Sequence, residues 1–251
     1  MDAPCAALPP IRARAVVVGA SSGIGAALVR ELVGRGFQVA ALARRAEELD
    51  ALARELGPER VLAKVHDVRR REEVPALFEE LVRRLGGLDW LVYASGIMPK
   101  VGPSEFDTEI DAEILSVNTL GAISWCNPAA EYFLAQRRGV IVGICSIAGD
   151  RGRRGNPVYG ASKAALIHYL EALRNRLSDY GVRVCTIQPG RVATVMTEGL
   201  RERGIAPEAA ARTIVSYAAW GCSTRYVPLR WHAISLVLRA IPSFLFRRLT
   251  I

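Results

Sequence analysis

A glycine-rich loop between an apolar run and a helical pattern constrains the fold of this chain more than any other stretch. Residues 15–18 are continuously apolar, as in a strand buried on both faces, and residues 26–32 repeat apolar side chains at helical spacing. Glycines let the backbone approach a pyrophosphate, and the first turn of a helix offers it free N–H groups. The order strand, loop, helix therefore predicts a dinucleotide site at Gly19, Ser21, Ser22, Gly23, Ile24 and Gly25.

Apolar strand-like runs alternate with helical patterns along the rest of the chain. The runs cover residues 38–43, 61–65, 88–93, 139–145 and 183–188. Such alternation predicts an α/β fold with a Rossmann-like, doubly wound, seven-stranded parallel sheet and helices on both faces. We expect a single domain over residues 1–251. Within it, residues 12–190 would form the cofactor-binding and catalytic core, 191–225 a substrate-side loop and helix, and 226–251 an apolar tail.

The end of the second predicted strand indicates which dinucleotide is bound. Arg44 and Arg45 stand there, where an NAD site has an acidic residue for the ribose 2′-hydroxyl. Because arginine binds phosphate in a bidentate manner, the pair predicts NADP(H). The alternative is that both side chains simply begin an exposed helix.

The next two strand ends also carry residues that suit a dinucleotide. Asp67, followed by Val68, either holds the adenine amino group or caps the next helix. Ala94, Ser95 and Gly96 are small, so a ribose could pass close to the backbone there. Ligands of doubly wound sheets bind at the carboxyl ends of the strands, and all of these motifs lie at such ends.

A hydroxyl, a phenol and an ammonium group come together at Ser146, Tyr159 and Lys163. Tyr159 and Lys163 share a helix face because they are four residues apart, and Ser146 ends a strand from which it can fold back beside them. This grouping suits proton transfer to a carbonyl oxygen. Asn118 lies among apolar residues of a predicted helix over residues 107–134, where its amide either makes a structural hydrogen bond or holds a water.

Residues 12–215 resemble the short-chain dehydrogenase/reductase family. The loop G-A-S-S-G-I-G is similar to the family's cofactor loop, and Y-G-A-S-K at residues 159–163 fits its YxxxK motif. P-G-R-V-A-T at residues 189–194 is similar to its nicotinamide-side segment, whereas residues 94–96 read A-S-G where the family often has N-A-G. The order and spacing of the family's catalytic tetrad are matched by Asn118, Ser146, Tyr159 and Lys163.

The resemblance implies an oxidoreductase that interconverts a ketone and a secondary alcohol, and the arginine pair predicts NADP(H) as its cofactor. Tyr159 would donate the proton, while Lys163 would lower the pKa of the phenol and hold the nicotinamide ribose. Ser146 would polarise the substrate oxygen, and Asn118 would hold a water that links Lys163 to solvent. The nicotinamide side of the cofactor would contact Pro189, Gly190, Val192 and Thr194.

Two alternatives remain on the same fold. One is a non-catalytic, NADP-sensing or scaffold protein, since fold does not fix function. The other is an epimerase or dehydratase. Because all four catalytic positions are retained, we expect an enzyme.

The C-terminal segment departs from the family pattern. It lacks the D-G-G type sequence that precedes the last strand in tetrameric members, so we expect a homodimer. Residues 228–251 instead place Trp231, Ile234, Leu238 and Ile241 on one helical face, and Pro242 ends that helix. This tail is either a lid or dimer contact, or an amphipathic segment with its apolar side in lipid and its arginines at headgroups. A lipophilic substrate, such as a ketoacyl, polyketide-like or lipid-linked ketone, would suit it.

Arginines dominate the net charge of +8. They predict either a solvated basic surface or attraction to a phosphorylated cofactor or lipid headgroups. Arg151, Arg153 and Arg154, between Ser146 and Tyr159, either meet a phosphate or carboxylate on the substrate or are solvated. We expect a small-molecule substrate and no nucleic acid.

Cysteine usage and the absence of targeting signals bear on the compartment. The 5 cysteines show no CxxC and no metal spacing, which is typical of a reducing compartment and predicts no metal site. Residues 1–10 lack the positive region and apolar core of a signal peptide, and no charge-free apolar run reaches the length of a spanning helix. We therefore expect a cytoplasmic protein whose tail, in the amphipathic alternative, contacts the inner face of a membrane.

Overall fold

The computed structural model describes residues 12–102, 104–194, 196 and 204–249. The signal-peptide expectation for residues 1–10 and most of the expected substrate-side loop at 195–203 lie outside the described residues. The strands are β1 (Ala13–Val18), β2 (Phe37–Ala43), β3 (Val61–Val65), β4 (Trp90–Tyr93), β5 (Gly139–Ile144), β6 (Val182–Pro189) and β7 (Thr224–Val227). The longer helices are α1 (Gly23–Gly34), α2 (Ala46–Leu56), α3 (Val74–Leu85), α4 (Thr108–Leu115), α5 (Gly121–Gln136), α6 (Pro157–Leu177), α7 (Pro207–Ala219) and α8 (Arg230–Ala240).

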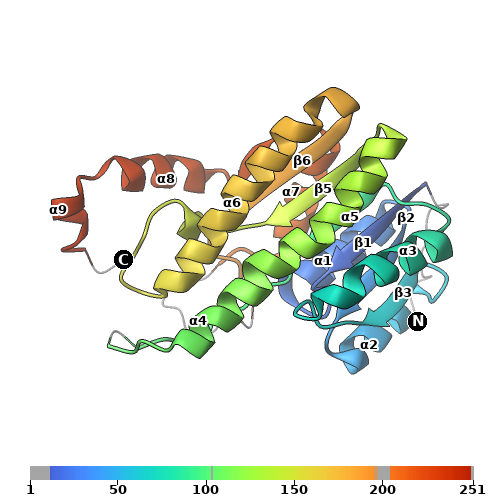
Figure 1. Cartoon of the computed structure of the whole chain (residues 1–251), viewed down its shortest axis with the longest axis horizontal. Helices are drawn as coiled ribbons and strands as arrows, with labels where there is room; N and C mark the ends of the chain where they lie inside the picture. The colour runs from blue at the N-terminus through green and yellow to red at the C-terminus, as the bar shows by residue number, and fades with distance from the viewer. Residues whose placement is uncertain (1–11, 103, 195, 197–203, 250–251) are drawn as a thin grey trace, which may run out of the picture.

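The strands form one parallel sheet in the order β3-β2-β1-β4-β5-β6-β7 (Figure 1). The predicted seven-stranded, doubly wound sheet is therefore confirmed. The strand order reverses between β1 and β4, and in sheets of this kind the ligand crevice opens at that point. The glycine loop after β1 and the small residues after β4 lie on either side of it.

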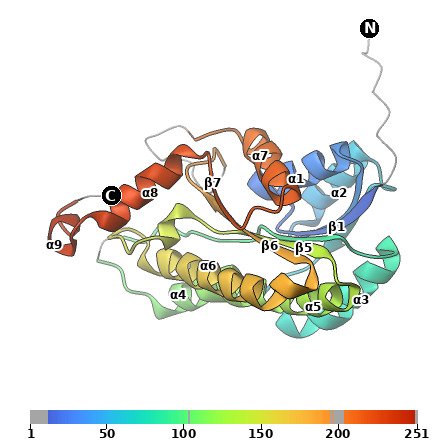
Figure 2. The same cartoon turned by 90° about the horizontal axis from the view of Figure 1, so that it is seen from above.

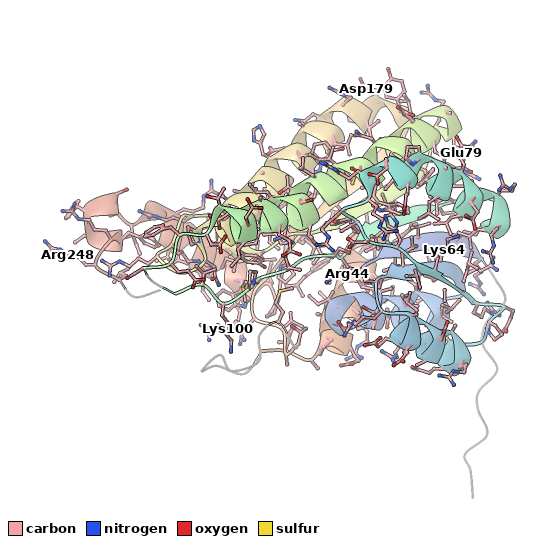
Figure 3. All side chains as sticks on the ribbon, turned by 60° about the horizontal axis from the view of Figure 1, so that its bottom comes forward. Arg44, Lys64, Glu79, Lys100, Asp179 and Arg248 are labelled. Carbon is pink, nitrogen blue, oxygen red and sulfur yellow. The ribbon has the colours of Figure 1, made fainter. Side chains whose placement is uncertain are left out.

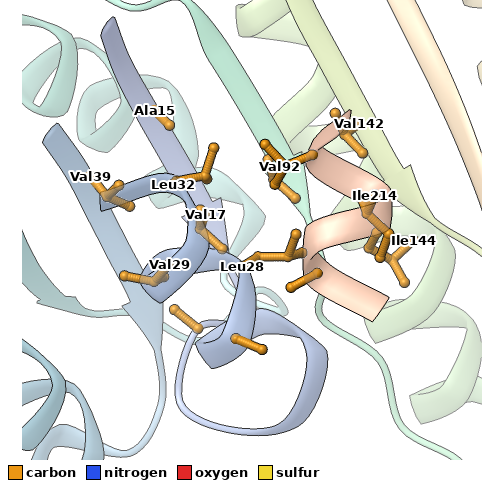
Figure 4. Packing of buried hydrophobic residues seen from close by; sticks show 14 of the residues in the cluster. Ala15, Val17, Leu28, Val29, Leu32, Val39, Val92, Val142, Ile144 and Ile214 are labelled. Carbon is orange, nitrogen blue, oxygen red and sulfur yellow. The ribbon is translucent and has the colours of Figure 1, made fainter. Parts of the chain in front are cut away.

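Helices cover both faces of the sheet. Figure 2 shows α1, α2 and α7 on one side and α3, α4, α5 and α6 on the other. The strands bury both of their faces, which explains why they read as continuous apolar runs in the sequence. On the α1 side, Leu28, Val29 and Leu32 pack with Ile214 of α7 against side chains of β1, β2, β4 and β5 (Figure 4).

The helix predicted over residues 107–134 is interrupted. Asp107 caps α4 by accepting hydrogen bonds from the backbone N–H groups of Glu109 and Ile110 at 2.9 and 3.1 Å. A π turn over Ser116–Leu120 then joins α4 to α5, and Asn118 lies within it. Single π turns inside α-helices occur frequently at functional sites.

The C-terminal tail, residues 228–249, leaves β7 and extends beyond the end of the sheet (Figures 1 and 2). It contains α8 and the short helix α9 (Ser243–Phe246), separated at Pro242 as the sequence predicts. Among the described residues, none of the helices has the length and apolar character needed to cross a membrane.

Candidate active site

The glycine loop lies where only glycine fits. Gly19 follows β1 with φ +93°, and a Cβ there would lie 2.4 Å from the backbone nitrogen of Ser95. A Cβ on Gly25 would lie 1.9 Å from the carbonyl oxygen of Gly19. The backbone of the loop thus packs directly against the backbone of the chain after β4 and against the start of α1. This leaves the N-terminal end of α1 open to a phosphate group.

A cavity of about 420 Å³ lies along the carboxyl ends of the strands. All of the expected cofactor-binding residues line it: Gly19, Ser21, Ser22, Gly23, Ile24, Gly25, Arg44, Arg45, Asp67, Val68, Ala94, Ser95, Gly96, Tyr159, Lys163, Pro189, Gly190, Val192 and Thr194. Ser146 lines it too, whereas Asn118 lies behind the wall. Further lining residues that the sequence motifs did not single out include His66, Ile97, Val117, Ile144, Cys145 and Met196.

The two arginines after β2 differ in their contacts. Arg45 donates through Nε and Nη2 to Ser21 Oγ at 3.2 and 2.8 Å, and its Nη1 lies 3.2 Å from Glu48. Arg44 is exposed and has no hydrogen bond or ion pair with any described residue. The side chain of Arg44 therefore remains available to a phosphate at the edge of the cavity.

Asp67 forms a local turn rather than a helix cap. Its Oδ1 accepts a hydrogen bond from the backbone N–H of Arg69 at 3.0 Å, and its Oδ2 lies 2.6 Å from Arg69 Nη2. Hydrogen bonds from Arg69, followed by the weaker effect of the Arg44 charge, hold the pKa of Asp67 below its usual value. The caps of the next two helices are Arg70 and Glu73, so the capping alternative for Asp67 is wrong.

Ser146, Tyr159 and Lys163 meet at the wall of the cavity. Lys163 Nζ lies 5.9 Å from the centroid of the Tyr159 ring and donates to the carbonyl oxygen of Ile144 at 3.0 Å. Ser146 Oγ accepts a hydrogen bond from the N–H of Ala148 at 3.1 Å. Tyr159 and Lys163 are only 7% and 4% exposed, so their charged forms are poorly solvated.

Burial has the largest effect on the pKa values of Tyr159 and Lys163. It raises the pKa of Tyr159, while the Ser146 hydroxyl and the positive charge of Arg153 act in the opposite direction. Burial also lowers the pKa of Lys163. A phenol that keeps its proton at neutral pH can serve as a proton donor.

The Asn118 amide makes three hydrogen bonds to protein groups, and its Oδ1 can accept one more. Its Oδ1 accepts from the N–H of Ile97 at 2.8 Å, and its Nδ2 donates to Ile97 O and Ser162 Oγ, each at 3.0 Å. Ser162 Oγ in turn donates to the carbonyl oxygen of Tyr159 at 2.8 Å. These contacts bear out the structural hydrogen bond, and they reveal Ser162, one turn of helix after Tyr159, as a residue that sequence reasoning missed.

The loop between Ser146 and Tyr159 is bound to the tail. Arg154 Nη2 donates to the carbonyl oxygen of Arg247, and the guanidinium of Arg151 lies 4.0 Å from the centroid of the Phe246 ring. Arg151 Nη1 also donates to three backbone carbonyls near the junction of α8 and α9, those of Leu238, Arg239 and Ile241. Neither Arg151 nor Arg154 is therefore purely solvated.

Asp150 forms a second link between this loop and the tail. Its carboxylate accepts hydrogen bonds from Ser235 of α8, from Tyr226 of β7 at 3.1 Å and from Gln188 of β6 at 3.2 Å. Trp231 lies against Gly190, where a Cβ would be 2.0 Å from the indole nitrogen. The tail thus contacts both the loop between Ser146 and Tyr159 and the predicted nicotinamide-side segment. No local pattern in the sequence indicated this network.

Known proteins match the chain over most of its length. Residues 13–204 fit the family model described as short chain dehydrogenase. The chain belongs to the short-chain dehydrogenase/reductase family. It is 37% identical over 186 residues to carbonyl reductase family member 4 of Xenopus tropicalis, and 36% identical over 186 residues to a 3-oxoacyl-[acyl-carrier-protein] reductase of Bos taurus. Each match covers 74% of this chain and 78% of the relative.

Solved structures agree with this assignment. A crystal structure of an actinorhodin polyketide ketoreductase variant with NADPH superposes with a TM-score of 0.77 at 26% identity, covering 86% of this chain and 95% of that one. A short-chain dehydrogenase/reductase from Mycobacterium ulcerans, at 22% identity and a TM-score of 0.80, shares the fold over 87% of this chain and 89% of that one. This short-chain dehydrogenase/reductase is therefore an NAD(P)-dependent oxidoreductase.

Proposed function

We propose that this enzyme reduces a ketone to a secondary alcohol with NADPH, and that Tyr159 donates the proton. The observation that carries the proposal is that Ser146, Tyr159 and Lys163 line the same cavity as the glycine loop. Bound NADPH would supply the hydride. The protein would bind the ketone, exclude water and deliver the proton to the carbonyl oxygen.

Each polar side chain at the cavity wall has a role in this reaction. Tyr159 keeps its proton until the carbonyl oxygen becomes basic, because burial raises the pKa of the phenol. Ser146 donates a hydrogen bond to the same oxygen and so stabilises the charge that develops on it. Lys163 holds the nicotinamide ribose and, by its charge, favours loss of the phenol proton. Asn118 stays in the proposal as the residue that holds a water connecting Lys163 to solvent.

The cavity residues fit NADPH. The close backbone packing at Gly19 and Gly25 leaves room for a pyrophosphate at the start of α1. Arg44 has no protein partner among the described residues, so it would bind the 2′-phosphate, with Arg45 beside it. Residues 189–194 would contact the nicotinamide.

The proposed substrate is lipophilic, either a ketoacyl or polyketide-like compound or a lipid-linked ketone. The printed names of the relatives support this, since they include a 3-oxoacyl-[acyl-carrier-protein] reductase and a polyketide ketoreductase. The tail supports it as well, because its apolar side chains remain exposed: Leu229 is 58% exposed, Leu236 56%, Val237 63% and Phe244 57%. We propose that this apolar surface contacts a membrane, and that the enzyme is a homodimer in the cytoplasm.

Replacement of the proton donor tests the proposed reaction. Tyr159→Phe should lower kcat/KM for ketone reduction by about 10²- to 10⁴-fold, the usual contribution of a general acid. NADPH affinity, measured by fluorescence titration, should change by less than about twofold, because the phenyl ring is kept. Tyr180→Phe is the matched control, since Tyr180 is 40% exposed and lies in the turn that follows α6. Near-normal rates in Tyr159→Phe would show that another group donates the proton.

A further inference from the structure

The Ser146 hydroxyl is carried by a short turn that follows β5. A single 3-10 turn over Ile147–Gly149 follows Ser146, and Asp150 comes directly after it. The N–H of Gly149 donates to the carbonyl oxygen of Ser146 at 3.0 Å, and the N–H of Ala148 donates to Ser146 Oγ at 3.1 Å. The N–H of Asp150 donates back into the turn at 3.1 Å. Residues 146–150 therefore form one hydrogen-bonded unit, in which the positions of Ser146 and Asp150 depend on each other.

This turn lies directly against the start of α6, which carries Tyr159 and Lys163. A Cβ on Gly149 would lie 2.8 Å from both the backbone nitrogen of Ala164 and the carbonyl carbon of Lys163. The two backbones are therefore in contact. A shift of the turn along α6 would change the separation between the Ser146 and Tyr159 hydroxyls, and catalysis is sensitive to such displacements.

Asp150 connects the turn to three other elements. Its carboxylate accepts hydrogen bonds from Gln188 of β6 at 3.2 Å, from Tyr226 of β7 at 3.1 Å and from Ser235 of α8. All three partners are buried, and the hydroxyls of Tyr226 and Ser235 lie 3.1 Å apart. Hydrogen bonds to a charged group are stronger than those between neutral groups. Asp150 is thus the point at which the sheet and the tail together hold the turn that carries Ser146.

We propose that Asp150 is a positioning residue for Ser146, and that Ser235 of the tail contributes to this role. Without the carboxylate, the turn would lose its hydrogen bonds to β6, β7 and α8 and would shift on α6. The Ser146 hydroxyl would then no longer reach the oxygen that Tyr159 protonates. The inference rests on the proposed function, because it adds two residues that act on that same site without lining the cavity.

Four substitutions test this role. Asp150→Ala removes all three hydrogen bonds. Asp150→Asn keeps the shape of the side chain, and its amide can still pair with Gln188, whose own amide oxygen is buried without a hydrogen bond. Ser235→Ala removes the contact from the tail. Ser243→Ala is the matched control, because Ser243 is an exposed serine at the start of α9 in the same tail.

The kinetic measurements use ethyl 3-oxobutanoate, ethyl 3-oxohexanoate and ethyl 3-oxooctanoate with NADPH, below the unfolding temperature of every variant. Asp150→Ala should lower kcat about 10- to 100-fold, since a misplacement of about 1 Å can cost a factor of that size. Asp150→Asn should recover part of the loss, Ser235→Ala should show a smaller loss, and Ser243→Ala should match the wild type. Kd for NADPH should stay the same, because neither Asp150 nor Ser235 lines the cavity. An unchanged kcat in Asp150→Ala would overturn the proposal.

A double-mutant cycle with Ser146→Ala separates positioning from a purely structural role. If Asp150 acts through Ser146, Asp150→Ala should lower kcat much less in the Ser146→Ala background than in the wild type, because the hydroxyl that it positions is already absent. A general loss of folded protein would lower kcat by the same factor in both backgrounds. Equal factors in the two backgrounds would therefore contradict the positioning role.

Amide hydrogen exchange, followed by NMR, gives a readout that does not depend on turnover. In Asp150→Ala, the N–H groups of Ala148 and Gly149 should exchange faster than in the wild type, while those of β1 should not change. If the wild type reduces the esters and Asp150→Ala keeps both its kcat and its exchange rates, the ketone reduction stands and the positioning role is wrong. If no form reduces any ester but exchange in the turn rises, the proposed reduction fails and Asp150 still holds the turn.

Discussion

Two adjacent arginines after β2 have different surroundings, and this difference bears on cofactor choice. Arg45 is held by Ser21 and Glu48, so its donors are already in use. Arg44 has no such partner among the described residues and lines the cavity. Arg44 would contribute more than Arg45 to the affinity for a 2′-phosphate, because Arg44 breaks no existing contact when it binds the phosphate.

Arg44→Ala should therefore weaken NADPH binding by about 10- to 100-fold and leave NADH binding nearly unchanged. Arg45→Ala should have a smaller effect on NADPH, since its guanidinium is shared with Ser21 and Glu48. Fluorescence titration of both reduced cofactors measures these constants. A wild type that prefers NADH, or an Arg44→Ala variant that loses both cofactors equally, would remove the basis for NADPH selectivity.

At the scale of elements, the tail has a side that is bound to the rest of the protein and a side that is free. Ser235 is buried against Asp150, and Trp231 lies on Gly190. The opposite side presents Val237 and Phe244, which are 63% and 57% exposed. Arg248 lies at the outer end of the molecule (Figure 3), so cations accompany the exposed apolar residues. Such a surface is typical of segments that rest in the headgroup region of a bilayer.

Co-sedimentation with liposomes tests the membrane contact at this element. Wild-type protein should bind vesicles of phosphatidylglycerol and phosphatidylcholine, and binding should fall with added salt because the arginines contribute by charge. The double substitution Val237→Asp, Phe244→Asp should reduce the bound fraction about tenfold or more, since it places two charges in the apolar contact. Trp220→Asp is the control, because Trp220 is 78% exposed but lies at the end of α7. Equal binding by all forms would rule out docking through the tail.

Local sequence patterns predicted the sheet well because buried parallel strands are continuously apolar. They did not predict the π turn at Ser116–Leu120, since one extra residue barely disturbs the helical period. The local sequence patterns also did not predict the contacts of the tail. Arg151 meets Leu238, which is 87 residues further along the chain, and no local pattern encodes such an approach. The partners of Asn118 and the link through Ser162 depend on the same kind of long-range packing.

For the molecule as a whole, the parallel sheet explains why a scattered set of motifs forms one cavity. The loops after β1, β2, β3, β4, β5 and β6 all open at the same edge, because the strands run in one direction. Tyr159 and Lys163 reach that edge from α6, which begins after the loop that the tail holds. The tail adds an apolar surface beside this edge without entering the sheet.

Isotope transfer tests the central claim most directly. NADPH carrying deuterium at C4 of the nicotinamide, prepared separately on each face, is incubated with the enzyme and ketones of graded chain length, and the alcohols are examined by mass spectrometry. The proposed reaction predicts that one of the two labelled cofactors transfers deuterium to the carbinol carbon, and that Tyr159→Phe loses this transfer by about 10²- to 10⁴-fold. Absence of deuterium from every alcohol with either cofactor would contradict it.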